Sequence, residues 1–384
     1  MRITHVTAHN WRNFKKLSFS IGDRLLIVGP NASGKSNLLD LFRFLGDIAR
    51  PGGGLAAAID ARGGLSRIRC LFARNHRKGE LGIEVTLQDG ETIWHYELAL
   101  KGRSGGKNQP QVVREIVRKD GETLLERPDQ FDASDPDRML QTHLEQISAN
   151  QAFRPIADHF AKVSYFHLVP QIIRNPQLAG VFSTKEFGST MIAEMSGTPK
   201  QTREAWLRRM VKALRAAVPN FTSLELKTDS AGHPHLVAGY QNWRSTPSEQ
   251  NESEFSDGTL RLIGLLWSIV SAPNNGGVLL LEEPELSLNS AVVRVLPSLL
   301  AVSQRSSTMQ VILSTHASEL LDDEGIHPDE VLVLQVTDDG TVAHRLSDIP
   351  EVADEIAAGL PLSETTGTLL APEDLSGLFL AAKR

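Results

Sequence analysis

A chain of 384 residues can bury a large core in one or two domains, and its 40 lysines and arginines against 46 acidic residues give a net charge of −6. This balance does not indicate nucleic-acid binding over the whole surface. The single cysteine, Cys70, excludes a disulfide framework and a cysteine-built metal site. No apolar run approaches the ~20 residues of a membrane span and no signal peptide is evident, so we expect a cytoplasmic protein without membrane contact.

The N-terminal segment predicts two short strands, because Met1 to Ala8 and Leu17 to Ile21 alternate apolar and polar residues. The turn between them reads Asn10-Trp11-Arg12-Asn13-Phe14-Lys15. Two interpretations of this turn stay open. Arg12 and Lys15 either flank a ligand bound by the next motif, or they belong to a solvated turn that an aromatic side chain anchors.

The phosphate-binding pattern G-x-x-x-x-G-K-S/T is matched in full from Gly29 to Ser36. An apolar strand is expected before it, from Leu25 to Val28, and a helix after it, from Asn37 to Leu45. Its glycines let the backbone turn around a phosphate, and the helix presents its positive end to the same oxygens. The residues expected to bind a nucleoside triphosphate are Gly29, Asn31, Ala32, Ser33, Gly34, Lys35, Ser36 and Asn37, with Lys35 on the β- and γ-phosphates and Ser36 on Mg²⁺.

The next part of the chain predicts antiparallel strands. Leu81 to Leu87, Ile93 to Leu100 and Val112 to Val117 alternate in polarity and are separated by glycine-containing turns. Helical spacing follows from Asp137 to Lys162 and includes Gln146.

A basic amphipathic helix is expected from Thr202 to Val218. Its positive charges are Arg203, Arg208, Arg209, Lys212 and Arg215. They indicate either a nucleic-acid contact or a solvated helix face.

Three further motifs place small polar or charged residues at the start of an apolar helix or at the end of a buried strand. Phe255-Ser256-Asp257-Gly258-Thr259-Leu260-Arg261 opens an apolar helix, where Ser256 or Asp257 is either a helix cap or part of an anion site. The buried strand Val278 to Leu281 ends in Glu282 and Glu283, at the edge where α/β sheets place their ligands. The strand Val311 to Thr315 ends in His316.

Taken together, these motifs resemble the RecF, SMC and OLD branch of the ABC ATPases, and in particular the compact AAA-like ATPases without coiled coil that occur in bacterial defence systems. The resemblance implies an α/β fold: an ABC-ATPase head with a P-loop core sheet, an antiparallel β subdomain and a helical signature lobe. It implies three parts, namely residues 1–136 with the phosphate loop and the β subdomain, 137–275 with the signature segment, and 276–384 with the glutamate pair, the histidine and a C-terminal hairpin.

The resemblance also implies roles for single residues. Glu282, an aspartate in most relatives, would hold hydrated Mg²⁺, Glu283 would be the general base, and His316 would reach the γ-phosphate. Gln146 would contact Mg²⁺ and the attacking water, with Gln171 as a rival and a solvated helix glutamine as the alternative. Ser256 and Gly258 would contact the nucleotide of the opposite subunit.

The implied function is hydrolysis of ATP to ADP and phosphate by a head-to-tail homodimer, or a higher oligomer, that closes around ATP and Mg²⁺. Its implied setting is an anti-phage or toxin-type defence system with a separate nuclease or toxin as effector. The alternative is a RecF-like DNA repair ATPase that binds duplex DNA. The signature sequence argues against a transport cassette, and Glu283 with His316 argues against a non-hydrolysing scaffold.

Overall fold

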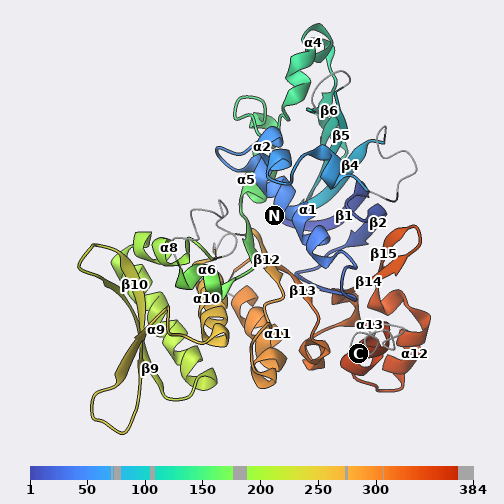
Figure 1. Cartoon of the computed structure of the whole chain (residues 1–384). Helices are drawn as coiled ribbons and strands as arrows, with labels where there is room; N and C mark the ends of the chain where they lie inside the picture. The colour runs from blue at the N-terminus through green and yellow to red at the C-terminus, as the bar shows by residue number, and fades with distance from the viewer. Residues whose placement is uncertain are drawn as a thin grey trace, which may run out of the picture. The chain divides into compact units, whose positions relative to one another are not determined.

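The computed structural model of the protein describes residues 1–70, 72, 79–103, 109–175, 188–272, 276–305 and 307–370 (Figure 1). The chain forms two compact units. Unit 1 comprises Met1–Ser164, Asn274–Leu280 and Ser307–Arg384, and unit 2 comprises Tyr165–Pro273 and Leu281–Ser306. The units are interleaved in the sequence, whereas the three parts expected from the motifs are consecutive.

Unit 1 contains a six-stranded antiparallel sheet in the order β2-β1-β4-β5-β6-β7. Its strands are β1 (Arg2–Trp11), β2 (Phe14–Ser20), β4 (Leu81–Asp89), β5 (Thr92–Gly102), β6 (Pro110–Lys119) and β7 (Glu122–Arg127). Every second residue of β4 is buried, because successive side chains of a strand point to opposite faces of the sheet. The strands expected from the alternation at 81–87, 93–100 and 112–117 are confirmed.

A second sheet carries the phosphate-loop strand near its middle, in the order β15-β14-β3-β13-β12-β8. Its strands are β3 (Arg24–Val28), β8 (Val163–Phe166), β12 (Val278–Glu282), β13 (Gln310–Thr315), β14 (Val331–Thr337) and β15 (Gly340–Arg345). Strands β13 and β14 both run parallel to β3, on either side of it, and β14 and β15 form the expected hairpin. Strands β3 and β13 are buried almost throughout, as strands covered on both faces must be. The expected mixed α/β fold is confirmed.

The helix after the phosphate loop, α1 (Lys35–Ala49), packs closely on α5 (Arg154–Ala161) and the start of β8. A Cβ atom on Gly46 would lie 3.0 Å from the Cβ of Val163 and 3.1 Å from the carbonyl oxygen of Phe160. The small residue therefore lets the two helices approach. The other helices of unit 1 are α2 (Leu55–Asp60), α3 (Leu65–Ile68), α4 (Gln130–Ser134), α12 (Pro350–Ala357) and α13 (Leu362–Leu370), with 3₁₀ turns at η1 (Pro136–Leu140), η2 (Gln151–Phe153), η4 (Ser318–Asp322), η5 (Pro328–Glu330) and η6 (Leu346–Asp348).

The helix expected from Asp137 to Lys162 is interrupted in its middle, at residues 141–150. Only η1, η2 and α5 are helical, and residues 141–150 form irregular turns. Local side chains satisfy the backbone there: the carboxylate of Glu145 accepts hydrogen bonds from the N–H groups of Thr142, at 2.6 Å, and Leu55, at 3.0 Å. Such bonds compete with those of a helix.

Unit 2 combines helices with a three-stranded antiparallel sheet in the order β11-β10-β9. Its elements are α6 (Pro170–Arg174), α8 (Met191–Gly197), α9 (Lys200–Ala217), β9 (Phe221–Thr228), β10 (Pro234–Tyr240), β11 (Ser248–Asn251), α10 (Asp257–Ser271) and α11 (Ser290–Arg305). The apolar face of α9 lies in the core, where Trp206 meets Trp267 of α10 edge to face at 5.4 Å. None of the helices that the structure describes has the length and apolar composition needed to cross a bilayer.

A buried arginine, Arg127, ties β6 and β7 to the segment that follows them. Its guanidinium donates to Glu115, at 3.0 Å, and makes two hydrogen bonds to Asp132, at 3.0 and 2.9 Å. All three side chains are fully buried. Glu115 also accepts the backbone N–H groups of His143, at 2.8 Å, and Leu144, at 3.1 Å. The network therefore holds the irregular segment against the sheet.

Removal of Arg127 should cost much of the stability of unit 1. In an Arg127→Met variant Glu115 stays buried without a cation and Asp132 keeps only Arg138, and breaking a buried ion pair from one side costs about 3–5 kcal/mol. Urea unfolding should show a loss of this size in the free energy of unfolding. The matched control is Arg114→Met, on the exposed face of β6, where the loss should stay below about 1 kcal/mol. Equal losses of unfolding free energy in the two variants would contradict a stabilising role for the buried Arg127 network.

Acid should weaken the same network. Burial alone raises the pKa of Asp132, but hydrogen bonds from Arg127, the Asp129 N–H and Arg138 bring that pKa far below its usual range. A depressed pKa stabilises the fold fully above the unfolded-state value, about 3.9, and this stabilisation is lost as the pH falls toward the folded-state pKa. Between about pH 5 and 3 the wild-type protein should therefore lose more unfolding free energy than Asp132→Asn, as measured by urea titration at each pH.

Candidate nucleotide-binding site

The loop between β3 and α1 wraps around the ammonium group of Lys35. The Lys35 Nζ donates to the carbonyl oxygens of Gly29, at 2.9 Å, and Pro30, at 3.1 Å, and the residue is only 5% exposed. To turn this tightly the backbone takes positive φ angles at Ala32 (63°) and Gly34 (100°). The sequence pattern thus forms a closed cradle around a positive charge.

Both glycines of the cradle are required by close contacts. A Cβ atom on Gly29 would lie 2.6 Å from the Oγ of Ser33 and 2.9 Å from the carbonyl oxygen of Leu334. A Cβ atom on Gly34 would lie 2.2 Å from the amide nitrogen of Asn13. No side chain fits at either position without moving the loop or its supports.

Asn13 and Thr341 hold the cradle from outside. The side-chain amide of Asn13 donates to the carbonyl oxygen of Ser33, at 2.8 Å, and its oxygen accepts from the Asn37 amide, at 2.9 Å. The hydroxyl of Thr341 donates to the same Ser33 oxygen, at 2.8 Å. Neither residue was singled out from the sequence, although Asn13 belongs to the quoted N-terminal turn.

The structure places Arg12 against α1. Its Nη2 donates to the Oδ2 of Asp40, at 2.7 Å, and Arg62 donates to the Oδ1 of the same carboxylate, at 2.9 Å. Burial alone raises the pKa of Asp40, but the two guanidinium groups hold it below its usual value. The adjacent Trp11 is fully buried and donates to the Asn37 carbonyl oxygen, at 2.7 Å, as the aromatic anchor of the turn. Contact of Arg12 with a nucleotide stays a prediction.

His316 meets the lysine of the cradle. At the end of β13 its Nδ1 lies 3.4 Å from the Nζ of Lys35. An ammonium group only donates, so the facing Nδ1 must accept, which places the ring proton on Nε2. Nε2 is then the atom that can donate a hydrogen bond to a phosphate oxygen.

In unit 2, the glutamate pair ends β12 in a strained turn. The φ angle is positive at Glu283 (43°) and at Ser287 (62°). Because such angles are unfavourable for residues other than glycine, they indicate a turn that is held in place by its surroundings. The hydroxyl of Tyr165, at the end of β8, donates to the carboxylate of Glu282. Tyr165 could not be identified from local sequence patterns, because its partner lies more than a hundred residues away.

The segment from Ser256 to Gly258 forms the start of α10. Ser256 caps the helix and accepts the Thr259 N–H at 3.2 Å, so the cap expected from the sequence is present. A Cβ atom on Gly258 would lie 2.4 Å from the carbonyl oxygen of Ser287. The glycine therefore lets the helix start pack directly on the turn after the glutamate pair.

Arg261 adds a positive charge near the carboxylates of Asp257, Glu283 and Glu285. Its pKa is lowered, because burial outweighs the attraction of Asp257, Glu283 and Glu285. Arg174 forms an ion pair with Asp257, at 2.6 Å, and so fixes the same end of α10.

The two candidate glutamines lie in different surroundings. Gln146 belongs to the irregular segment 141–150, where its amide donates to the side chain of Gln141 at 3.2 Å. Gln171 is exposed on α6, which starts a few residues after β8. The role of Gln146 at Mg²⁺ stays a prediction, with Gln171 as its rival.

The donor set in unit 1 fits a triphosphate. The buried ammonium group inside the loop and the N-terminus of a 15-residue helix both favour an anion. Mg²⁺ in such sites takes few protein ligands besides phosphate oxygens, and the Ser36 hydroxyl is of the oxygen type it prefers. The carboxylate of Glu282, in unit 2, is of the same type.

Comparison with known proteins agrees with this assignment. The family model described as "AAA domain, putative AbiEii toxin, Type IV TA system" matches residues 25–322, more than half of the chain. No curated protein matches the chain.

Solved structures of SMC heads share the fold. The SmcHead bound to the C-winged helix domain of ScpA matches with a TM-score of 0.54 and 14% identity, over 90% of this chain and 97% of that chain. The SMC head domain from Thermotoga maritima matches with a TM-score of 0.50 and 15% identity, over 90% and 99%. The Smc head domain from Pyrococcus furiosus with an extended coiled coil, bound to the C-terminal domain of ScpA, matches with a TM-score of 0.50 and 13% identity, over 93% and 99%.

Because the family model covers both the phosphate loop and the glutamate pair, the chain belongs to the family of AAA domains described as putative AbiEii toxins, and its fold is that of an SMC head, an ABC-type ATPase.

Proposed function

We propose that this protein binds ATP with Mg²⁺ at the phosphate loop and hydrolyses it to ADP and phosphate. The observation that carries the proposal is the cradle around Lys35, with His316 3.4 Å from the lysine nitrogen. Lys35 and the loop N–H groups would bind the β- and γ-phosphates. Mg²⁺ supplies charge neutralisation when bound, and Ser36, Glu282 and a glutamine, Gln146 or Gln171, would hold it.

Glu283 would accept the proton of the attacking water. It follows a buried strand at the sheet edge where α/β folds bind ligands, in a turn where its backbone has a positive φ angle. His316 would donate from Nε2 to the γ-phosphate, since Nδ1 faces Lys35. Tyr165 would orient Glu282 through its hydroxyl.

The active form in this proposal is a head-to-tail dimer. Ser256 and Gly258 would contact the nucleotide held by the phosphate loop of the other subunit, as the ABC-type fold implies. A closed two-fold arrangement of this kind buries two ATP molecules and can open after hydrolysis.

The proposed setting is a toxin-type or anti-phage defence system in the cytoplasm, in which the ATPase acts with a separate effector, a nuclease or toxin. The family description, which names a putative toxin and a type IV TA system, supports this setting. Higher oligomers of the dimer would be compatible with it.

A RecF-like DNA ATPase is the second candidate, and helix α9 favours it. Arg208, Arg209 and Lys212 are exposed on this helix, while Arg203 and Arg215 donate to backbone carbonyl oxygens of neighbouring segments. Arg208 and Lys212 are four residues apart and share one face of the helix. This face offers charges to a phosphate backbone.

Substitution of the proposed general base should trap the dimer. Glu283→Gln keeps the shape of the side chain but cannot accept the proton, so hydrolysis should fall by at least about 100-fold. Light scattering should show a dimer of this variant with ATP and Mg²⁺ and a monomer without them. The control Glu283→Gln/Lys35→Ala should stay monomeric, because it lacks the lysine that binds the phosphates. A monomeric Glu283→Gln protein at saturating ATP would refute the proposal.

DNA separates the two candidate settings. In the defence setting, duplex DNA should leave the hydrolysis rate unchanged. In the RecF-like setting, DNA should stimulate hydrolysis, and the effect should weaken steeply between about 50 and about 200 mM salt. It should also disappear in Arg208→Glu/Lys212→Glu but persist in Lys200→Glu, a control in the first turn of the same helix.

Co-purification with Glu283→Gln, compared with Lys35→Ala, would identify the partner. A nuclease or toxin retained only by the Glu283→Gln protein would support the defence setting. DNA with repair factors would support the RecF-like one.

A further inference from the structure

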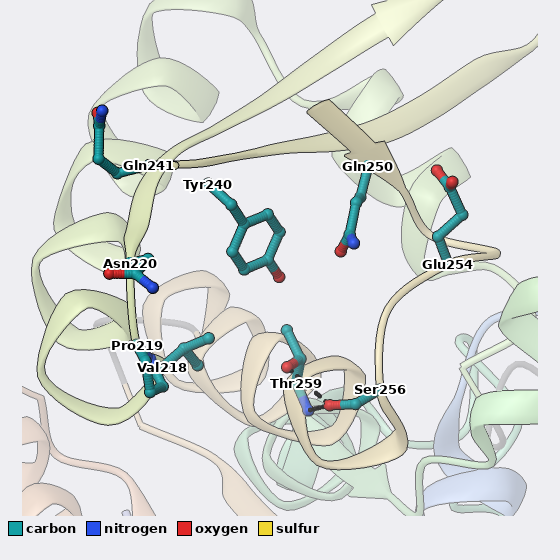
Figure 2. A pocket seen from close by; sticks show the side chains of 9 residues that line it. All are labelled: Val218, Pro219, Asn220, Tyr240, Gln241, Gln250, Glu254, Ser256 and Thr259. Atoms are coloured by element: carbon teal, nitrogen blue, oxygen red, sulfur yellow. Dashed lines mark hydrogen bonds between the residues drawn. The ribbon is translucent and has the colours of Figure 1, made fainter. Parts of the chain in front are cut away.

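A polar pocket of about 400 Å³ lies in unit 2 beside the start of α10 (Figure 2). It is lined by Val218, Pro219, Asn220, Tyr240, Gln241, Gln250, Glu254, Ser256 and Thr259. These residues come from the end of α9 and the residues after it, from the three-stranded sheet, and from the segment 254–259 around the start of α10. The volume falls in the range of small-molecule sites.

The chemistry of the lining excludes an anion inside the pocket. Among the residues that the structure describes, the lining has no lysine, arginine or histidine, and the carboxylate of Glu254 is its one charged side chain. Asn220 and Gln250 each offer a donor and an acceptor at the end of a planar amide, whereas the amide nitrogen of Gln241 donates to the carbonyl oxygens of Asn242, at 3.0 Å, and Arg244, at 3.2 Å. A neutral, planar group with hydrogen-bonding edges suits such a lining, as amide side chains pair with the edges of nucleobases.

Tyr240 supplies an aromatic surface in the middle of the pocket. Figure 2 shows its ring between Asn220 on one side and Gln250 on the other, with the hydroxyl directed toward Thr259. The ring is fixed edge to face on Phe221, with centroids 5.5 Å apart. Burial raises the pKa of Tyr240, whereas a hydrogen bond between its hydroxyl and the Thr259 side chain lowers it, so the hydroxyl already has a partner beside the pocket.

Ser256 links the pocket to the anion-binding end of α10. Its hydroxyl lines the pocket and caps the helix, accepting the Thr259 N–H at 3.2 Å and lying 2.9 Å from the Thr259 hydroxyl. The first N–H groups of α10 lack partners within the helix and favour an anion just outside the pocket. A ligand with a neutral planar part and phosphates matches both features at once.

We infer that this pocket takes the nucleoside part of a nucleotide whose phosphates lie at the start of α10. The inference rests on the proposed function: in the head-to-tail dimer, the nucleotide is the one held by the partner's phosphate loop. The pocket would then give the dimer its preference for one base.

Photolabelling tests this placement. Glu283→Gln protein with Mg²⁺ and 8-azido-ATP, whose reactive group is on the base, is irradiated, digested and analysed by mass spectrometry, while light scattering reports the dimer in the same sample. The inference expects label on peptides that contain Asn220 or residues 240–254. A dimer labelled only in peptides of unit 1 would overturn the inference and leave the proposed function intact. A monomer labelled in residues 240–254 would overturn the dimer but keep the nucleoside site.

Substitutions give a second readout. Gln250→Ala should lower the preference for ATP over GTP in dimer formation about five- to tenfold, since it removes hydrogen bonds to the base. Tyr240→Phe, which keeps the ring, should weaken dimer formation less. The control is Glu249→Gln, on the neighbouring position of β11, whose side chain pairs with Lys227 on the exposed face of the sheet. An unchanged ATP to GTP ratio in Gln250→Ala, with an unchanged unfolding midpoint, would contradict the inference.

Discussion

The buried ammonium group of Lys35 is the constraint on which the nucleotide-facing part of unit 1 depends. A cation withdrawn from water is costly unless oxygen atoms surround it, and here the loop supplies two of its own carbonyl oxygens. To bring them there the backbone must turn through positive φ angles, which explains Gly34. The need to surround this cation with oxygen atoms therefore explains the shape of the loop.

Other buried guanidinium groups organise the rest of unit 1 in a similar way. Arg62, whose side chain is 3% exposed, binds Asp40 and Asp47 of α1, at 2.8 and 3.0 Å, and lies over the ring of Phe44. Arg127 joins carboxylates from β6 and α4. Each arginine holds together segments that secondary-structure propensity does not connect, because its planar guanidinium group can bind two carboxylates at once.

Local patterns in the sequence predicted the strands around the phosphate loop and in the β subdomain. A strand buried on one face alternates apolar and polar residues, and a strand buried on both faces is a continuous apolar run. Such patterns did not predict Asn13 with Thr341, or Tyr165 with Glu282, because those contacts join residues far apart in the chain. The helix expected from Asp137 to Lys162 is interrupted at residues 141–150, because side-chain hydrogen bonds replace helical ones there. The three-stranded sheet of unit 2 was missed, since polar residues such as Glu249 and Gln250 fill much of β11.

The contact between Gly258 and Ser287 has a mechanical consequence. Because Gly258 has no side chain, the start of α10 lies directly against the carbonyl oxygen of Ser287. No side chain stands between them that could absorb a displacement by changing its rotamer. A shift of the strained turn after the glutamate pair must therefore move the helix start by a comparable amount. The start of α10, which carries Ser256 and Gly258, is thus coupled directly to the turn that follows the glutamate pair of the same subunit.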